Sequence, residues 1–363
     1  MMHKRWLCAG VLAVLMVLLL LAIGCNGKET GEVTEGGTPA TEDTPITVVY
    51  GGAFPPESDT GLVHQAWMDK IVERSEGRVQ FETHWMWSLI PAQEEAPKGV
   101  KEGIADIHAF FWDPSLTPVN YGLENMPFMG WPSREAILAI WHQLHEEFPV
   151  MSEELSKLGV KMYGLGTGSP NNLGFTNKVV RVPEDIKGMP IHVWGPSPFA
   201  DLLSKAGATP VELGFGDIYT GFDTGIVEGG IGPATATDAT GVTDFMKHVT
   251  VFGDTGFGVF FQFVIINPEF YNNLPEDIRQ IFDELEPFLV EETIRMQTEL
   301  HEAIMDRVAN AGHTITELTP EEIKLWEDLA TPLHEEWIEE MEAKGVPARA
   351  IYDRAKQLIE EYK

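Results

Sequence analysis

An alternation of strand-like and helix-like segments constrains the fold of this chain more than any other feature. Residues 46–50 form a β-branched run typical of a strand, and residues 60–76 place apolar side chains at helical spacing. Residues 79–83 alternate like a second strand, residues 92–102 look helical, and residues 105–111 form an apolar strand. Strands joined by a helical crossover pair in parallel, so this rhythm predicts an α/β fold.

The same rhythm returns further along the chain. A helix is expected over 133–157, and strands are expected over 190–194 and 210–213 with a helix between them. The apolar strand at 259–266 is long enough to return to the first sheet. Helical patterns dominate from residue 275 onward, so the last part of the chain is predicted to be helical.

The N-terminus has the pattern of an export signal. Two basic residues at 4–5 precede an apolar run at 7–23, and the tetrad AIGC at 22–25 resembles a bacterial lipobox. We predict that residues 1–24 are a lipoprotein signal peptide and that Cys25 is lipidated. The alternative is an uncleaved anchor helix, because the apolar run is of borderline length for a membrane span. In both cases the bulk of the chain lies outside the cytoplasm, in the periplasm or at the cell surface.

The segment after Cys25 is predicted to be a flexible tether. Residues 25–45 are rich in Gly, Thr, Glu and Pro and contain one large apolar residue, Val33, so they cannot bury a core. Cys8 and Cys25 are the only cysteines, and cleavage leaves Cys25 alone. A lipidated cysteine cannot pair, so the mature domain is expected to have no disulfide and no thiol chemistry.

The charge of the chain excludes several partners. Lys and Arg number 25 against 56 Asp and Glu, which gives a formal net charge of −31. Nucleic-acid binding relies on basic residues that neutralise phosphates, so no nucleic acid is expected as a partner. Docking on anionic lipid by a basic patch is also disfavoured, which leaves the lipid anchor as the expected contact with the membrane.

Motifs of enzymes are weak or absent in the sequence. It has no P-loop, no GxSxG, no HExxH and no Rossmann glycine fingerprint. His142 and His145 have a spacing that could place two imidazoles on one face of a metal site, but neighbouring glutamates fit a solvated surface equally well. We therefore predict no catalysis, no cofactor and no metal.

Several motifs stand in order along the middle of the chain. They read EGIADI at 102–107, NMPF at 125–128, GFTNK at 174–178, RVPEDIKG at 181–188, ATPVELGF at 208–215, TGIVEG at 224–229 and LPEDI at 274–278. Over about residues 46–311 this series resembles the solute-binding proteins of tripartite ATP-independent periplasmic (TRAP) transporters, of the dicarboxylate-binding type.

The resemblance implies a fold and a function. The fold would have two α/β lobes like other periplasmic binding proteins, with a long C-terminal helix spanning both. Lobe I would cover 46–168 with a return strand in about 253–285, lobe II would cover 169–252, and the C-terminal helices would cover 275–363. A small organic solute would bind in the cleft, the lobes would close by a hinge, and the monomer would then deliver the solute to the TRAP permease subunits in the membrane.

The chain departs from the family pattern at three polar positions. The arginine that grips the ligand carboxylate in the family corresponds to His192, a second common arginine to Leu173, and a common asparagine to Gly232. Histidine is smaller than arginine and only fractionally charged near neutral pH. An anionic ligand is therefore less favoured here than the family alone would imply.

Aromatic residues near the predicted strand ends offer a replacement. Trp faces can hold a cation, and the acidity of the chain would favour one. We expect a solute that is aromatic, bulky, neutral or cationic, although each tryptophan could equally belong to a lobe core. The expected ligand-binding residues are His192, Phe215, Phe175, Asn172, Trp194, Trp112, Trp87, Trp85 and Gly232, with Asp113 or Glu228 as possible partners of a cation.

Two other functions stay open at this point. A lipoprotein of the same fold could sense a ligand instead of handing it to a permease. A cleft enzyme would use His192 or His108 as a general base, but the sequence offers neither residue an evident acid or nucleophile as its partner.

Overall fold

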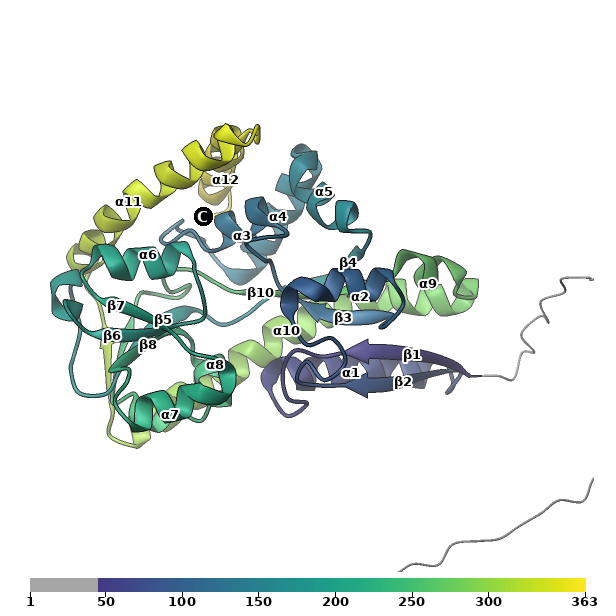
Figure 1. The fold of residues 1–363 in the computed structure, drawn as a ribbon, viewed down its shortest axis with the longest axis horizontal. Helices are drawn as coiled ribbons and strands as arrows, with labels where there is room; N and C mark the ends of the chain where they lie inside the picture. The colour runs from purple at the N-terminus through teal and green to yellow at the C-terminus, as the bar shows by residue number, and fades with distance from the viewer. Residues whose placement is uncertain (1–44) are drawn as a thin grey trace, which may run out of the picture. The chain divides into compact units, whose positions relative to one another are not determined.

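The computed structural model describes residues 45–363, which belong to one compact unit (Figure 1). The predicted signal peptide, Cys25 and the predicted tether up to residue 44 lie outside the described residues. Within residues 45–363, no helix is both long enough and apolar enough to cross a membrane.

Lobe I is built on a five-stranded sheet. The strand order is β2-β1-β3-β10-β4, with β1 parallel to β2 and β3, and β10 antiparallel to β3 and β4. The strands are β1 (Ile46–Gly51), β2 (Val79–His84), β3 (Ile107–Phe110), β4 (Lys161–Thr167) and β10 (Phe261–Ile266). The helices of this part are α1 (Asp59–Arg74), α2 (Ala96–Lys101), α3 (Pro118–Glu124), α4 (Arg134–Glu147), α5 (Pro149–Leu158) and α9 (Pro268–Asn273).

Lobe II is built on a six-stranded sheet of order β11-β9-β5-β8-β6-β7. The strands are β5 (Asn171–Phe175), β6 (Pro190–Val193), β7 (Thr209–Glu212), β8 (Gly229–Pro233), β9 (His248–Val251) and β11 (Thr314–Glu317). The helices of this part are α6 (Pro198–Lys205), α7 (Ile218–Asp223) and α8 (Ala234–Ala239). The chain passes between the two sheets three times: from β4 to β5, from β9 to β10, and from β10 to β11 through the helices between them.

One long helix joins the lobes. α10 (Glu276–Asn310) packs against α1 and β4 of lobe I and against α8 and β11 of lobe II, and in Figure 1 it runs diagonally from α9 toward α8 and α7. α11 (Pro320–Ala343) then packs on α6 of lobe II, and α12 (Ala348–Glu361) packs on α4 of lobe I. The predicted two-lobed α/β fold with a long helix spanning both lobes is confirmed.

Large buried side chains fill both faces of each sheet. Trp67 and Phe282 pack under one face of the lobe I sheet, and Trp141 packs against the opposite face. Phe175 and Trp326 lie together in the core of lobe II, between its sheet and α11. Each lobe therefore has its own apolar core, so each sheet is stabilised within its own lobe.

Two local expectations were wrong. The single helix predicted over 133–157 is two helices, α4 and α5, which meet at Phe148 with φ −124° and ψ 89°. Pro149 disfavours the helical conformation of the residue before it, so α4 ends there and α5 begins at the proline. The strand β11 was not predicted, because TITE at 314–317 is too short to stand out without its partner β9.

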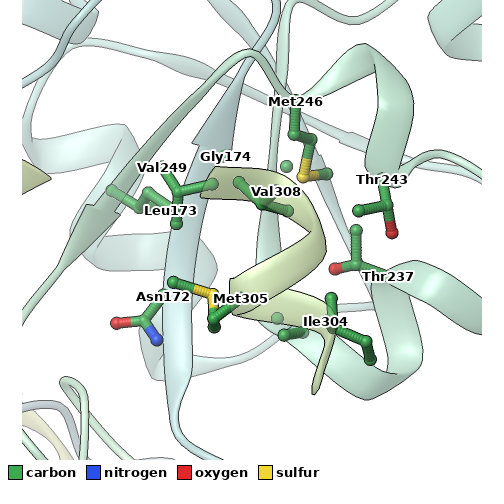
Figure 2. Close-up of a pocket in the computed structure, with 13 residues that line it drawn as sticks. Asn172, Leu173, Gly174, Thr237, Thr243, Met246, Val249, Ile304, Met305 and Val308 are labelled. Carbon is green, nitrogen blue, oxygen red and sulfur yellow. The ribbon is translucent and has the colours of Figure 1, made fainter. Parts of the chain in front are cut away.

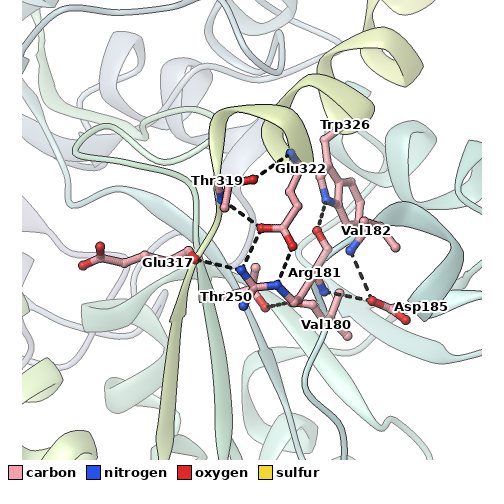
Figure 3. Close-up of polar contacts among 9 residues, drawn as sticks. All are labelled: Val180, Arg181, Val182, Asp185, Thr250, Glu317, Thr319, Glu322 and Trp326. Atoms are coloured by element: carbon pink, nitrogen blue, oxygen red, sulfur yellow. Dashed lines mark hydrogen bonds and ion pairs between the residues drawn. The ribbon is translucent and has the colours of Figure 1, made fainter.

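Arg181, from the RVPEDIKG motif, fastens α11 to lobe II (Figure 3). Its guanidinium forms a bidentate ion pair with Glu322, with Nη2 2.8 Å from Oε2. Glu322 also accepts from the amide of Thr319 at 2.8 Å in a capping box, and Trp326 Nε1 donates to the carbonyl of Arg181 at 3.0 Å. This arginine is fully engaged in the fold and is not free to hold a solute.

Candidate functional site

The lobes touch at the ends of their strands. The ring centroids of Phe54, which follows β1, and Phe215, which follows β7, are 6.3 Å apart. Tyr121 of α3 donates its hydroxyl to the carbonyl of Pro196, which follows β6, at 2.7 Å. In α/β proteins ligands bind beyond the carboxyl ends of the strands, so these contacts mark the place where a solute site would form.

His192 lies within β6, where its side chain is only 2% exposed. Neither ring nitrogen has a hydrogen-bond partner in the part of the chain that the structure describes. Burial lowers the pKa of His192 to about 4, so the imidazole is neutral at neutral pH. One ring nitrogen can then donate a hydrogen bond while the other accepts one.

Trp194 stands beside His192 and fills space that Gly232 leaves open. The Trp194 ring lies 5.1 Å from the His192 ring in an edge-to-face arrangement, and its Nε1 donates to the carbonyl of Ile231 at 3.0 Å. A Cβ added to Gly232 would lie 2.8 Å from Trp194 Nε1, so a larger residue there would displace the indole. Trp194 as a whole residue is 43% exposed, so part of its surface is open to a solute.

Asn172 pairs with Gly232 across the sheet of lobe II, and its carboxamide oxygen accepts from the amide of Phe252 at 3.3 Å. Asn172 also lines a cavity of about 30 Å³ between β5, β8 and α10 (Figure 2). Met246, Ile304 and Val308 close its far side. A site for a small organic molecule usually needs about 300 Å³ or more, so this cavity is too small to be the solute site.

Lobe I contributes tryptophans from the loop after β2. Trp85 packs on Tyr50 with ring centroids 5.1 Å apart, and Trp87 stacks on His108 at 5.4 Å and an interplanar angle of 28°. Both are partly buried. His108 is fully buried, its Nδ1 lies 2.6 Å from the carbonyl oxygen of Ala109, and burial lowers its pKa to about 4.

Four partly exposed phenylalanines form a continuous row across the lobe boundary. The row begins in lobe II with Phe215, which faces Phe54. The ring centroids of Phe54 and Phe111 are 5.4 Å apart, and those of Phe111 and Phe260 are 5.1 Å apart. We call these four residues the phenylalanine row. Their rings form an apolar surface to which both lobes contribute. Aromatic rings in such tilted contacts favour a further aromatic ring at a similar centroid distance.

The segments at the strand ends carry acids and no bases. Residues 52–58, 85–92, 111–117, 194–197 and 213–217 contain Glu57, Asp113 and Asp217 but neither Lys nor Arg. Asp113 is 8% exposed, and its Oδ1 accepts from the amide and hydroxyl of Ser115 at 2.8 and 2.6 Å. The site therefore offers no guanidinium or ammonium group to a carboxylate.

Two of the expected ligand residues lie in lobe cores. Phe175 is fully buried in the core of lobe II, and Trp112 is 3% exposed and packs on Phe263 with centroids 4.5 Å apart. Leu173, expected from the resemblance to correspond to a family arginine, is 1% exposed and faces the same core as Phe175. The structure thus gathers His192, Trp194, Gly232 and Asn172 on lobe II but separates Phe175 and Trp112 from them.

His142 and His145 lie on α4, and the contacts of His145 are those of a structural residue. His145 Nε2 lies 2.7 Å from Oδ1 of Asn120, and the ring packs beside Trp112 and Trp141. Burial lowers the pKa of His145 to about 4. Among residues 45–363, no group of three or more His, Cys, Asp or Glu is placed to hold a metal ion.

Sequence reasoning missed Phe54 and Phe260 as site residues. Phe54 lies three positions beyond the last residue of β1, outside the run that signalled the strand. Phe260 precedes β10, and because β10 is antiparallel to β3 and β4, its start meets the ends of those strands. The sequence could have pointed to Phe260 only if β10 had been recognised as antiparallel to β3 and β4. An antiparallel strand begins at the edge of the sheet where its neighbours end.

Two α/β lobes connected by two crossing segments and one long helix, with their strand ends facing each other, define the class of two-lobed solute-binding proteins. Comparison with known families agrees. The chain belongs to bacterial extracellular solute-binding protein family 7, the family of TRAP transporter receptors, whose model matches residues 51–340.

Two curated relatives are similar to this chain over part of its length. The chain is 27% identical to the C4-dicarboxylate-binding periplasmic protein DctP of Rhodobacter capsulatus over 47% of this chain and 51% of that protein. It is 26% identical to the ectoine-binding periplasmic protein TeaA of Halomonas elongata over 54% of this chain and 56% of that protein. The aligned part thus spans about half the length of these curated relatives.

A solved structure with a similar fold is that of a TRAP solute-binding protein from Rhodoferax ferrireducens T118, which was determined with copurified benzoate. The identity is 21%, the TM-score is 0.77, and the match covers 87% of this chain and 98% of that one. At this identity the likeness shows the shared fold alone.

Proposed function

We propose that this protein is an extracytoplasmic receptor, anchored to the membrane through lipidated Cys25, that captures a small organic solute between its lobes and delivers it to a TRAP permease. Membership of the family supports the receptor role. The lipobox and the tether support the anchor, because a tethered domain can reach a permease in the same membrane.

We further propose that the solute is aromatic or bulky and carries no net negative charge. His192 carries most weight here, because a neutral buried imidazole stands where the family usually places the arginine that grips a carboxylate. A carboxylate brought to this place would lose its hydration without gaining a charged partner, which costs several kcal/mol.

The aromatic character of the solute is supported by the phenylalanine row and Trp194. These rings present faces from both lobes, so a flat solute could stack on them as the lobes close. A cationic ring or amine would gain further from the aromatic faces and from the negative charge of Glu57 and Asp217, which lie in the segments after β1 and β7. The names of two similar proteins support a solute outside the C4-dicarboxylates, since TeaA is named for ectoine and the Rhodoferax protein was solved with benzoate.

Mass spectrometry of solute that copurifies with the protein is the most direct test. Titration calorimetry with benzylamine, benzyl alcohol, benzoate and succinate then separates ring recognition from charge recognition. We expect benzylamine or benzyl alcohol to bind more tightly than succinate, and recovered solute to be chemically unchanged. Micromolar or tighter binding of succinate would falsify the uncharged or cationic ligand class.

A variant pair sharpens the test. His192→Arg restores the charge that the family carries, and we expect it to gain about tenfold or more in benzoate affinity through a charge-assisted bidentate pair. His313→Arg adds the same charge before β11, away from the strand ends, and serves as the matched control. Equal gains in both variants would mean that only net charge matters and would count against a ligand contact at His192.

Delivery to a permease needs its own measurement. Permease genes beside the gene of this protein, and loss of uptake of the identified solute when the receptor is deleted, would support transport. A signalling protein encoded there instead, with uptake unaffected, would overturn the transport role while leaving solute binding intact.

A further inference from the structure

Gln297 occupies an unusual place on the long helix. It is 3% exposed and lies on the stretch of α10 where the helix passes from α1 and β4 of lobe I toward α8 of lobe II (Figure 1). The helix is held tightly against lobe I just before this point, because a Cβ added to Gly166 of β4 would lie 2.7 Å from Cγ2 of Thr293. Gln297 therefore projects from a fixed part of α10.

The two ends of the Gln297 carboxamide bind different lobes. Its Nε2 donates to Oδ2 of Asp59, the first residue of α1 in lobe I, at 2.6 Å. Its Oε1 accepts from the hydroxyl of Thr235, at the start of α8 in lobe II, at 3.1 Å. The same oxygen accepts from the amide of Ser169, in the segment crossing from β4 to β5, at 3.2 Å.

The neighbouring hydroxyls complete this arrangement. Ser169 Oγ lies 3.1 Å from Thr235 Oγ1. Because the Thr235 hydroxyl donates its proton to Gln297, its oxygen accepts a hydrogen bond from the Ser169 hydroxyl. The donors therefore run in sequence from Ser169 to Thr235 to Gln297. On the other side, Thr60 donates to Oε1 of Gln262 in β10 at 2.6 Å, so the start of α1 is fixed to the lobe I sheet as well. We call Asp59, Ser169, Thr235 and Gln297 the Gln297 bridge.

We propose that the Gln297 bridge couples the two lobes and sets the orientation in which their strand ends face each other. Thr235, Ser169 and Gln297 are all nearly or fully buried. Moving lobe II relative to α1 would leave a buried carboxamide or hydroxyl without a partner, which is costly. Gln297 is thus a positioning residue: it bonds residues that follow β1, β4 and β8. Through them it acts on the contacts Phe54–Phe215 and Tyr121–Pro196, which it does not itself make.

The test uses the unliganded full chain and therefore does not depend on the proposed solute. Gln297→Leu removes the hydrogen bonds at similar side-chain size, and Thr235→Val removes only the lobe II partner. Gln280→Leu is the matched control, because Gln280 lies on the same helix but bonds only Glu284 on the helix surface, at 2.7 Å. Amide hydrogen exchange measured by mass spectrometry reports on residues 194–197 and 213–217, far from the substitutions in sequence.

We expect Gln297→Leu and Thr235→Val each to speed exchange in 194–197 and 213–217 by about three- to tenfold, and small-angle scattering to give a larger radius of gyration. Gln280→Leu should change neither. If exchange rises only around residues 59, 169 and 235 while both remote segments keep wild-type rates, the bridge has a local structural role and the proposal is overturned. Should Gln297→Leu fail to fold, the same two readouts on Thr235→Val decide.

Discussion

A Cβ added to Gly232 would lie 2.8 Å from Nε1 of Trp194, and that nitrogen donates to the carbonyl of Ile231 at 3.0 Å. The space beside Gly232 in β8 is therefore occupied by the indole of Trp194, which follows the neighbouring strand β6. The absence of a side chain at Gly232 thus makes room for Trp194, which presents an aromatic face at this place.

Gly232→Asn should displace Trp194. We expect the free energy of unfolding to fall by about 1–3 kcal/mol, because the new side chain overlaps the indole in a packed region. Binding of benzylamine, where it is detected in the wild type, should weaken because the indole loses its position. Chemical denaturation and calorimetry measure the two effects.

The matched control for that change is Gly216→Ala. A Cβ at Gly216 meets nothing within 4 Å, so this variant should keep the stability of the wild type. An unchanged stability of Gly232→Asn would show that Trp194 can move away freely and that the two positions are independent.

His192 should make the stability depend on pH. Its folded pKa of about 4 is below the ordinary value near 6.5, so below pH 6.5 the unfolded chain binds more protons than the folded one. The free energy of unfolding should therefore fall as the pH drops from 6.5 to 4, by up to about 3 kcal/mol from this group. In His192→Gln this part of the fall should disappear, as measured by urea denaturation across the interval. Parallel curves for the two proteins would contradict it.

Glu124 should act in the opposite direction. Burial raises its pKa well above the ordinary value, while the amide of Phe261 donates to its Oε1 at 2.6 Å. Between the unfolded and the folded pKa, the folded chain binds more protons, so stability from this group is lost as the pH rises through that interval. Glu124→Gln keeps an acceptor for Phe261 and should flatten the loss. The comparison is made by denaturation from pH 4 upward, and a steeper loss in the variant would refute it.

Leu173→Arg should not restore a ligand contact. Leu173 is 1% exposed and faces the core of lobe II, so an arginine there would be a buried charge without a partner. We expect a loss of about 3–5 kcal/mol in the free energy of unfolding. Leu173→Met preserves volume and apolarity and should cost less than about 1.5 kcal/mol. Thermal and chemical denaturation of the pair give the difference, and similar stabilities would show that the position can open toward solvent.

Much of the fold could be predicted because its signals are local. The β-branched run at β1, the apolar run at β10 and the capping box formed by Thr319 and Glu322 each lie within a few residues. The division between α4 and α5 was missed although Pro149 marks it, and β11 was missed because it exists only through pairing with β9. Short strands owe their stability to partners that the local pattern does not show.

The candidate site was less predictable for the same reason. The sequence itself determined that the segments at the facing strand ends carry no basic residue and that the chain has the motifs of its family, since each of these depends only on which residue stands at which position. Burial and side-chain direction depend on which elements pack together. Only the tertiary structure placed Phe175 and Trp112 in cores, aligned Phe215 with Phe54, Phe111 and Phe260 across the lobes, and brought Gln297 between Asp59 and Thr235, residues 176 positions apart in the chain.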